Sequence, residues 1–204
     1  RTHSQSILPM VQELLAEAGL TLQQCDAIAF GAGPGSFTGV RTACGIAQGL
    51  AFGANLPVLP LVTLEAMALA CHQRTRSTEI LAVLDARMGE VYWAQYRYDG
   101  GLQVVSETAL CAPGDVAPLD VGGALTACGN GLAAYPDAFA GRAYAAGALL
   151  EIMPHAREVA QLGRAALAAG KAVTAAEAQP IYLRNKVAYT SAERQVINAA
   201  KAAA

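Results

Sequence analysis

A glycine-rich stretch between residues 29 and 41 limits what this chain can fold into more than any other feature. The apolar run 27–30 ends at Gly31, and a segment rich in alanine and glycine follows it. This pattern predicts a strand, a tight turn and a helix, an order that points backbone N–H groups and a helix N-terminus at an anion. The turn and the start of the helix consist of Gly33, Pro34, Gly35, Ser36, Phe37, Thr38, Gly39, Val40 and Arg41.

Two interpretations of this turn stay open. A phosphate-binding loop is the first, because glycine reaches positive φ and Ser36 or Thr38 can cap the helix that follows. The turn matches neither GxGxxG nor GxxxxGK[ST], however, and it holds no lysine. The second interpretation is a structural turn beneath a subunit interface. The candidate phosphate-loop residues are Gly33, Pro34, Gly35, Ser36, Phe37, Thr38, Gly39 and Arg41.

Two helices are predicted around this turn, and both carry an unusual face. Residues 4–18 have apolar side chains at helical spacing, among them Leu8, Val11 and Leu15. Residues 39–53 carry a row of glycines at every fourth position, although each interior glycine costs a helix about 0.5–1 kcal/mol. Such a row predicts the close approach of another backbone, within the fold or across an interface. The candidate interface residues are Leu8, Val11, Leu15, Gly45, Gly49 and Gly53.

Charge and cysteine content narrow the class of protein. The formal net charge is −2 over 204 residues, whereas a protein that binds nucleic acid unaided would usually carry a basic face. If RNA is the substrate, a partner is expected to hold it. The five cysteines are dispersed without a CxxC pair, which is typical of a reducing compartment and predicts a cytoplasmic location. No apolar run approaches the ~18 residues of a membrane span.

The order of elements predicts an α/β protein. Strands are expected at 58–62, 80–84, 91–98, 102–107 and 125–128, with helices at 63–70, 143–152 and 156–169. The polar segment 73–78 is the best candidate boundary between two lobes. We therefore expect a first lobe over 1–72, to which a C-terminal helix returns, a second lobe over 79–185, and a C-terminal helix or tail over 186–204.

The stretch Gly33-Pro34-Gly35-Ser36-Phe37-Thr38-Gly39-Val40-Arg41 resembles the signature of the TsaB family of bacterial tRNA threonylcarbamoyladenosine biosynthesis proteins. The resemblance extends through His3-Ser4 with Leu8-Pro9, Asp85-Ala86-Arg87-Met88-Gly89-Glu90-Val91-Tyr92 and Pro180-Ile181-Tyr182-Leu183-Arg184. It implies an actin-like (ASKHA, ribonuclease H-like) two-lobe fold. Members of the family begin with paired strands before the His-Ser helix, and the sequence in hand begins after them.

The sequence offers no catalytic constellation and no metal site. The three histidines are dispersed, and Ser36 does not stand in a nucleophile elbow. The cluster of Asp85, Arg87 and Glu90 is interpreted as a local ion-pair network rather than an acid–base group. The resemblance adds that Thr63 and Met67 stand where TsaD, the catalytic relative, has the His-x-x-x-His metal ligands, and neither side chain replaces imidazole. No cofactor is expected, while weak nucleotide binding at the turn stays open.

The resemblance implies a non-catalytic scaffold. Such a subunit stabilises TsaD and works with TsaE, and the complex transfers threonylcarbamoyl to the adenosine next to the anticodon of tRNAs that read codons beginning with A. A homodimer is expected when the chain is alone, with tRNA reached only through the complex and no contact with membranes. The alternative is an enzyme, either a glycoprotease-like metallopeptidase or an actin-fold phosphotransferase.

Overall fold

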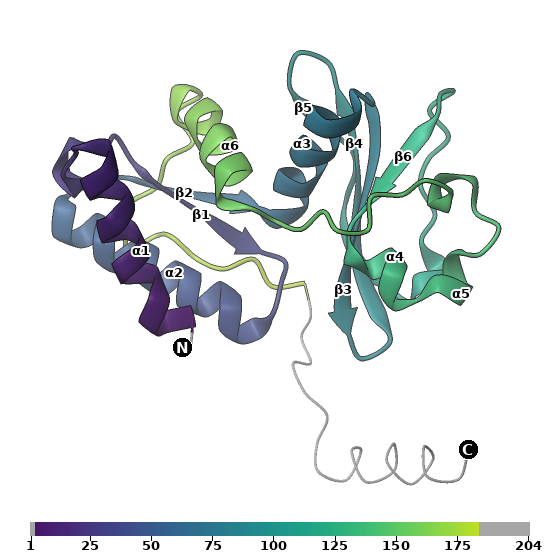
Figure 1. Cartoon of the computed structure of the whole chain (residues 1–204), viewed down its shortest axis with the longest axis horizontal. Coiled ribbons are helices and arrows are strands. Elements are labelled where there is room, and N and C mark those ends of the chain that lie inside the picture. Colours follow the sequence, from purple (N-terminus) through teal and green to yellow (C-terminus); the bar gives the residue numbers. More distant parts are fainter. Residues whose placement is uncertain (1–2, 184–204) are drawn as a thin grey trace, which may run out of the picture.

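The computed structural model describes residues 3–183 of the chain, and it consists of two sheets that stand side by side with helices packed on them (Figure 1). The first half contains α1 (His3–Ala18), β1 (Ile28–Gly33), α2 (Phe37–Ala54), β2 (Val58–Val62), α3 (Thr63–Thr75) and β3 (Glu79–Arg87). The second half contains β4 (Glu90–Tyr98), β5 (Leu102–Cys111), β6 (Leu125–Cys128), α4 (Asn130–Ala134), α5 (Pro136–Phe139) and α6 (Ala156–Ala168), with single 3₁₀ turns at Leu22–Gln24, Pro113–Asp115 and Ala143–Ala145. The mixed α/β architecture is the predicted fold class.

The first sheet pairs β1 with β2 in parallel, Ile28 opposite Val58 and Gly31 opposite Leu61. Helix α2 contacts β1 from one face, and α6 contacts both strands from the other. Gly163 permits this close approach of α6, because a Cβ atom there would lie 2.7 Å from the Ala29 Cβ. Parallel strands covered by helices on both faces are the usual arrangement for such a short apolar sheet.

The second sheet has the order β5-β4-β3-β6, with β6 parallel to β3 and the other pairs antiparallel. Helix α3 covers one face with the buried side chains of Leu64 and Met67, which pack on β3 and β4. The other face is covered by α4, α5 and the loop around Val116. Tyr92 and Tyr96 lie in the α3-facing core, Tyr98 stacks on His72 of α3 and Trp93 packs on the opposite face. The aromatic residues of β4 therefore serve packing.

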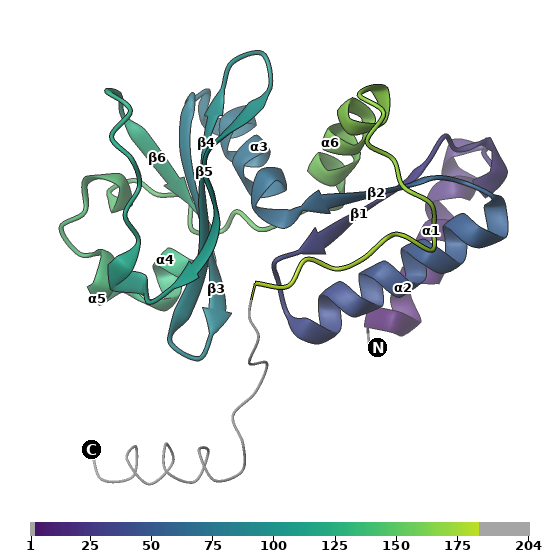
Figure 2. The ribbon, with the colours of Figure 1, turned by 180° about the vertical axis from the view of Figure 1, so that it is seen from behind.

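The C-terminal part of the described chain returns to the first sheet. Helix α6 packs on β1 and β2. The segment 172–183, hereafter the strap, lies along β2, β1 and α2 (Figure 2). The strap forms an isolated bridge between Val173 and Val58, and its Ala178 carbonyl accepts a hydrogen bond from the Gln48 amide at 2.9 Å. The lobe boundary at 73–78 remains a prediction, and the tail 186–204 lies outside the described residues.

The helix predicted over 143–152 is wrong. The chain makes a 3₁₀ turn at Ala143–Ala145 and further turns after it, and Leu149 forms an isolated bridge to Cys128. Gly141 and Gly147 adopt φ values of +75° and +78°, and this left-handed conformation interrupts a right-handed helix. Alanine propensity is a weak preference that tertiary contacts override here. No helix within residues 3–183 is both long and apolar enough to span a membrane.

Candidate functional site at the glycine-rich turn

The turn after β1 is held by hydrogen bonds that begin in its own sequence. Ser36 is the N-cap of α2, since its Oγ accepts a hydrogen bond from the Gly39 N–H at 3.1 Å. The Val40 N–H donates to the Ser36 carbonyl at 3.0 Å and starts the helix. A serine at this position satisfies a backbone donor that the helix cannot satisfy itself. The Ser36 hydroxyl thus caps the N-terminus of α2.

Two glycines of the turn lie so close to other parts of the chain that a side chain would disturb the strap at Gly33 and the helix cap at Gly39. Gly33 has φ +125°, and a Cβ atom there would lie 2.8 Å from the Ile181 carbonyl oxygen of the strap. A Cβ atom at Gly39 would lie 2.5 Å from the Ser36 Oγ that caps the helix. Both distances are shorter than van der Waals contact allows. The glycines therefore let the strap and the cap pack closely against the turn, whatever else the turn contacts.

Thr63 and Met67 on α3 have structural roles. The Thr63 Oγ1 donates a 2.6 Å hydrogen bond to the Pro34 carbonyl and joins the start of α3 to the glycine-rich turn. Met67 is fully buried in the core of the second sheet. A threonine hydroxyl engaged in a buried hydrogen bond and a buried thioether are poor ligands for a hard or borderline metal. Within residues 3–183, no cluster of three or more His, Cys, Asp or Glu side chains is suited to hold a metal ion.

The substitution Thr63→Val is expected to lower the free energy of unfolding by about 2 kcal/mol. Valine keeps the shape of threonine but leaves the Pro34 carbonyl without this donor, and an unsatisfied buried acceptor costs about 1–3 kcal/mol. Urea denaturation of the wild type and of Thr63→Val measures the loss. Thr63→Ser retains the hydroxyl and is the matched control; a loss in Thr63→Ser with none in Thr63→Val would show that the methyl group, not the hydrogen bond, matters.

A cleft of about 340 Å³ opens between the two lobes beside the turn. Residues from both sheets line it, so the cleft exists only because the two halves of the chain meet here. Its lining residues are Gly31, Pro34, Gly35, Ser36, Gly39, Val40, Thr63, Leu84, Asp85, Ala86, Arg87, Tyr92, Asn130, Met153 and Pro154. Three turns converge on it: the glycine-rich turn, the β3–β4 hairpin and the Gly129–Asn130 turn before α4.

Asp85 organises the second-lobe side of this cleft. Its carboxylate accepts hydrogen bonds from the Arg87 N–H at 2.8 Å and the Tyr135 hydroxyl at 3.1 Å, and it pairs with the Arg87 guanidinium at 3.2 Å. The Asp85 N–H donates to the Asn130 side chain at 2.9 Å. Burial, followed by the hydrogen bond and charge of Asp85, raises the pKa of Tyr135. These contacts support the ion-pair interpretation, because the carboxylate holds the hairpin in which Arg87 and Met88 have positive φ.

A surface cluster joins two segments that are far apart in the sequence. The Arg41 Nε donates to the Tyr182 hydroxyl at 2.7 Å, and its guanidinium lies 3.8 Å above the centre of the Phe37 ring. Arg41 therefore ties the strap to the first turn of α2 and makes a cation–π contact with Phe37. Sequence reasoning included Phe37 and Arg41 as site residues but not Tyr182, Asn130 and Tyr135. Only the fold brings Tyr182 to the glycine-rich turn, and Asn130 and Tyr135 to Asp85. The Gly129-Asn130-Gly131 turn signal was the available indication for Asn130.

The six predicted interface residues are placed differently by the two helices. A Cβ atom at Gly45, Gly49 or Gly53 would meet no atom within 4 Å, so the described part of the chain does not use the glycine row for packing. On α1, Leu8 is exposed, whereas Val11 and Leu15 are half-buried. The predicted apolar face of α1 is thus partly exposed, at Leu8, and partly buried, at Val11 and Leu15.

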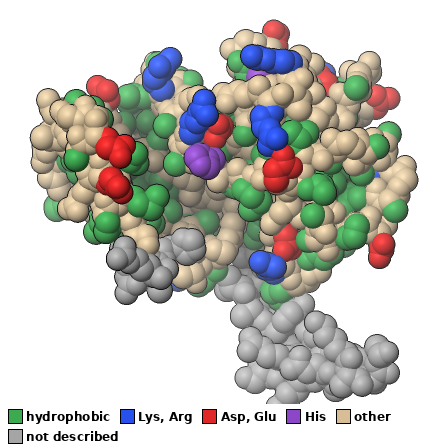
Figure 3. Space-filling view, in the orientation of Figure 1, with side chains coloured by type: hydrophobic (Ala, Val, Ile, Leu, Met, Phe, Trp, Pro, Cys, Tyr) green, Lys and Arg blue, Asp and Glu red, His purple; other side chains and the backbone are tan. Residues whose placement is uncertain are grey.

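The large exposed apolar side chains of α1 are Leu8, Met10 and Leu14. Apolar side chains with acidic ones beside them appear on the part of the surface that holds α1 (Figure 3).

Comparisons with known proteins agree with one another. The chain is 41% identical over 195 residues to the tRNA threonylcarbamoyladenosine biosynthesis protein TsaB of Escherichia coli, across 93% of this chain and 84% of that protein. The protein of the same name from Haemophilus influenzae is 41% identical over 199 residues, across 93% of this chain and 83% of that protein. The model of the family described as TsaD, tRNA N6-adenosine threonylcarbamoyltransferase, matches residues 1–203.

Solved structures show the same fold. YeaZ is another name for TsaB. The structure of YeaZ from Pseudomonas aeruginosa matches this chain with a TM-score of 0.81 and 38% identity, over 88% of this chain and 85% of that one. A protein described as similar to peptidase YeaZ, from the same organism, has a TM-score of 0.83 and 40% identity over 90% and 85%. These matches confirm the actin-like fold class and the resemblance of the sequence motifs. The chain belongs to the TsaD-related family and, within it, to the TsaB proteins.

Proposed function

We propose that this chain is a non-catalytic subunit of the complex that installs threonylcarbamoyl on the adenosine next to the anticodon of tRNAs reading codons that begin with A. Family membership assigns the chain to tRNA threonylcarbamoyladenosine biosynthesis. In the proposal the chain binds and stabilises TsaD, with TsaE as a third partner, and tRNA is bound by the whole complex. Without TsaD the chain forms a homodimer.

The observation that carries the non-catalytic role is the state of the polar groups around the cleft. The hydroxyls of Ser36 and Thr63 and the carboxylate of Asp85 each take part in hydrogen bonds that hold a turn in place. None of these described groups is paired with a histidine, as a nucleophile or a general base commonly is. This arrangement favours a scaffold over a metallopeptidase or a phosphotransferase. The lack of a resident cofactor and weak nucleotide binding at the turn remain predictions.

The surface of α1 and α2 supports the partner role. It combines three exposed apolar side chains on α1 with a glycine row on α2 that meets nothing within the described chain. Helices that lack side chains along one face let a second helix approach closely. The TsaD family model covers residues 1–203, so TsaD shares this chain's fold. A face that pairs with a copy of itself can therefore pair with TsaD in a similar, pseudo-twofold way.

Binding to TsaD tests this proposal. We expect the wild-type chain and TsaD to form a stoichiometric complex by light scattering after size exclusion. Leu14→Glu is expected to weaken the complex at least tenfold, because it places a charge in a desolvated apolar contact, and to reduce threonylcarbamoylation of tRNA by TsaD and TsaE. Gly49→Leu is expected to weaken binding by about 1–3 kcal/mol through overpacking while the isolated chain stays folded.

Leu119→Glu is the matched control, since Leu119 is also exposed but lies in the second lobe away from α1. It should leave binding to TsaD unchanged. If Leu14→Glu and Gly49→Leu bind TsaD as tightly as the wild type, the interface is elsewhere. If the isolated chain alone threonylcarbamoylates tRNA, the non-catalytic role is refuted.

A further inference from the structure

Phe52 is an unusual residue for the surface of a folded chain. Its side chain is 85% exposed, more than any other large apolar side chain among the described residues. It stands on α2 seven positions after Gly45 and three after Gly49, a spacing that puts all three residues on one face of the helix. A single exposed aromatic ring that projects from a helix face is the kind of side chain that anchors protein–protein contacts.

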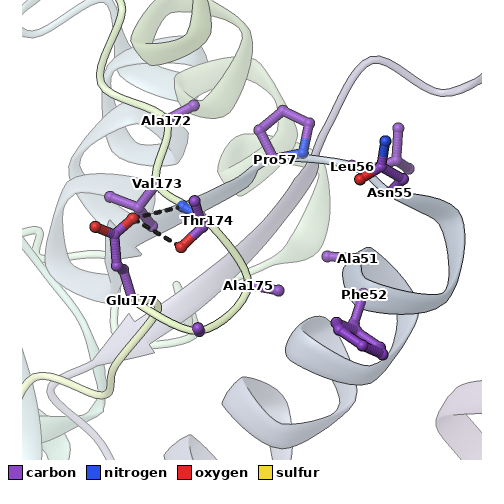
Figure 4. A pocket seen from close by; sticks show the side chains of 11 residues that line it. Ala51, Phe52, Asn55, Leu56, Pro57, Ala172, Val173, Thr174, Ala175 and Glu177 are labelled. Carbon is purple, nitrogen blue, oxygen red and sulfur yellow. Dashed lines mark hydrogen bonds between the residues drawn. The ribbon is translucent and has the colours of Figure 1, made fainter.

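An apolar pocket of about 580 Å³ lies beside this ring (Figure 4). One wall is the end of α2 with Ala51 and the link to β2 with Leu56 and Pro57, and the other is the strap with Val173 and Ala175. The strap is fixed here by the bridge from Val173 to Val58, so the pocket is bounded by two ordered segments. With 85% of its side chain in solvent, Phe52 stands at the rim and does not fill the pocket.

The chemistry of the pocket indicates what it accepts. Glu177 is the one charged side chain among its described lining residues. The Glu177 carboxylate is already engaged, since its Oε2 accepts hydrogen bonds from the Thr174 N–H at 2.9 Å and the Thr174 Oγ1 at 2.8 Å (Figure 4). The remaining walls are mostly methyl and methylene groups. The pocket therefore suits an apolar ring rather than a charged ligand or a phosphate.

We propose that in the homodimer the Phe52 ring of each copy inserts into this pocket of the other. This inference rests on the homodimer of the proposed function and names the contact that anchors it. Ring and pocket are neighbours on one face, so a twofold axis that passes between them brings each ring to the pocket of the other copy. A second copy is the occupant because it supplies both halves of the contact, and the two rings are then buried at the same time.

Two substitutions and their mixture test the reciprocal contact. Phe52→Ala removes the ring and leaves the pocket open, whereas Ala175→Phe keeps Phe52 and fills the pocket, into which the Ala175 methyl points (Figure 4). Each variant alone loses both contacts. An anchor of this kind contributes about 30-fold to affinity, so sedimentation equilibrium should show dimerisation weakened by about a thousandfold in each. The two variants mixed retain one complete contact, and native mass spectrometry should show a mixed dimer about 30-fold tighter than either variant alone.

The control is Val104→Ala, which truncates an exposed apolar side chain on β5 and should leave the dimer unchanged. Circular dichroism and thermal unfolding of Phe52→Ala should match the wild type, because so exposed a ring makes few contacts in the monomer. If the wild type is a monomer, if both variants dimerise normally, or if the mixture recovers nothing, the inference is wrong. A monomeric wild type would also overturn the homodimer of the proposed function. The test of TsaD binding with Leu14→Glu is independent of all three results, so the role as a TsaD partner can stand when this inference fails.

Discussion

Replacing Gly129 by alanine is expected to lower the free energy of unfolding by about 4 kcal/mol. The backbone conformation there disfavours any side chain, and a new Cβ atom would collide with the backbone of β3. Gly129 adopts φ +109° and ψ 162°, a conformation that is essentially restricted to glycine and costs other residues about 1–3 kcal/mol. A Cβ atom there would lie 2.2 Å from the Val83 carbonyl oxygen and 2.4 Å from the Met67 Cε. The methionine can shift, but the carbonyl belongs to a central strand, and overpacking adds about 1–3 kcal/mol.

Urea denaturation with purified protein measures this effect. The matched control is Gly101→Ala, in the same lobe, where a Cβ atom meets nothing within 4 Å and no positive φ is needed. It should change the free energy of unfolding by less than about 0.5 kcal/mol. A loss for Gly129→Ala no larger than that of Gly101→Ala would mean that the turn before α4 relaxes freely, and that this turn does not fix the second-lobe side of the cleft.

Gly33→Ala is expected to cost about 3 kcal/mol and to loosen the strap. The φ of +125° disfavours any side chain, and the new methyl group would press against the Ile181 carbonyl at 2.8 Å. The Ile181 N–H donates to the Ala32 carbonyl at 2.8 Å, so a displaced strap weakens this hydrogen bond too. Hydrogen exchange at Ile181 should therefore accelerate in Gly33→Ala under native conditions, beyond the loss seen in global unfolding.

Gly45→Ala serves as the control, and it is expected to raise the free energy of unfolding rather than lower it. A Cβ atom at Gly45 meets nothing within 4 Å, and alanine in a helix interior is favoured over glycine by about 0.5–1 kcal/mol. The variant should be more stable than the wild type as a monomer. If Gly33→Ala is as stable as Gly45→Ala, the glycine of the turn is not required by the strap, and the turn's glycines must be explained by a ligand or a partner.

The opposite expectations for these glycines bear on the proposed function. Gly33 and Gly129 are needed for the fold itself, whereas Gly45, Gly49 and Gly53 weaken α2 and meet no atom in the described chain. Three interior glycines lower the stability of α2, and no contact within the described chain compensates for this loss. The proposed partner surface supplies that contact in the assembly, and the test with Gly49→Leu separates the stability of the monomer from the affinity for TsaD.

The sequence by itself determined the elements whose signals are local. Helix α2 follows from the apolar run that ends at Gly31 and from the two cap candidates Ser36 and Thr38, because caps and turns act within three or four residues. The structure caps it with Ser36 and begins it at Phe37, two residues before the predicted start. The strands β2, β3, β4 and β6 likewise follow from short apolar runs between breakers. The family resemblance rested on the same local blocks, and the comparisons confirm it.

Only the tertiary structure decided which residues meet at the candidate site. Arg41 and Tyr182 are hydrogen-bonded although they are separated by 141 positions, and the strap reaches the glycine-rich turn only after α6 has returned to the first sheet. Residues 143–152 have helix propensity, yet they form turns and one bridge to β6, because sheet and core contacts outweigh a preference of a few tenths of a kcal/mol per residue. The same residue type is obligatory at Gly33 and dispensable for the monomer at Gly49, since the difference lies in atoms contributed by distant segments and not in the neighbouring sequence.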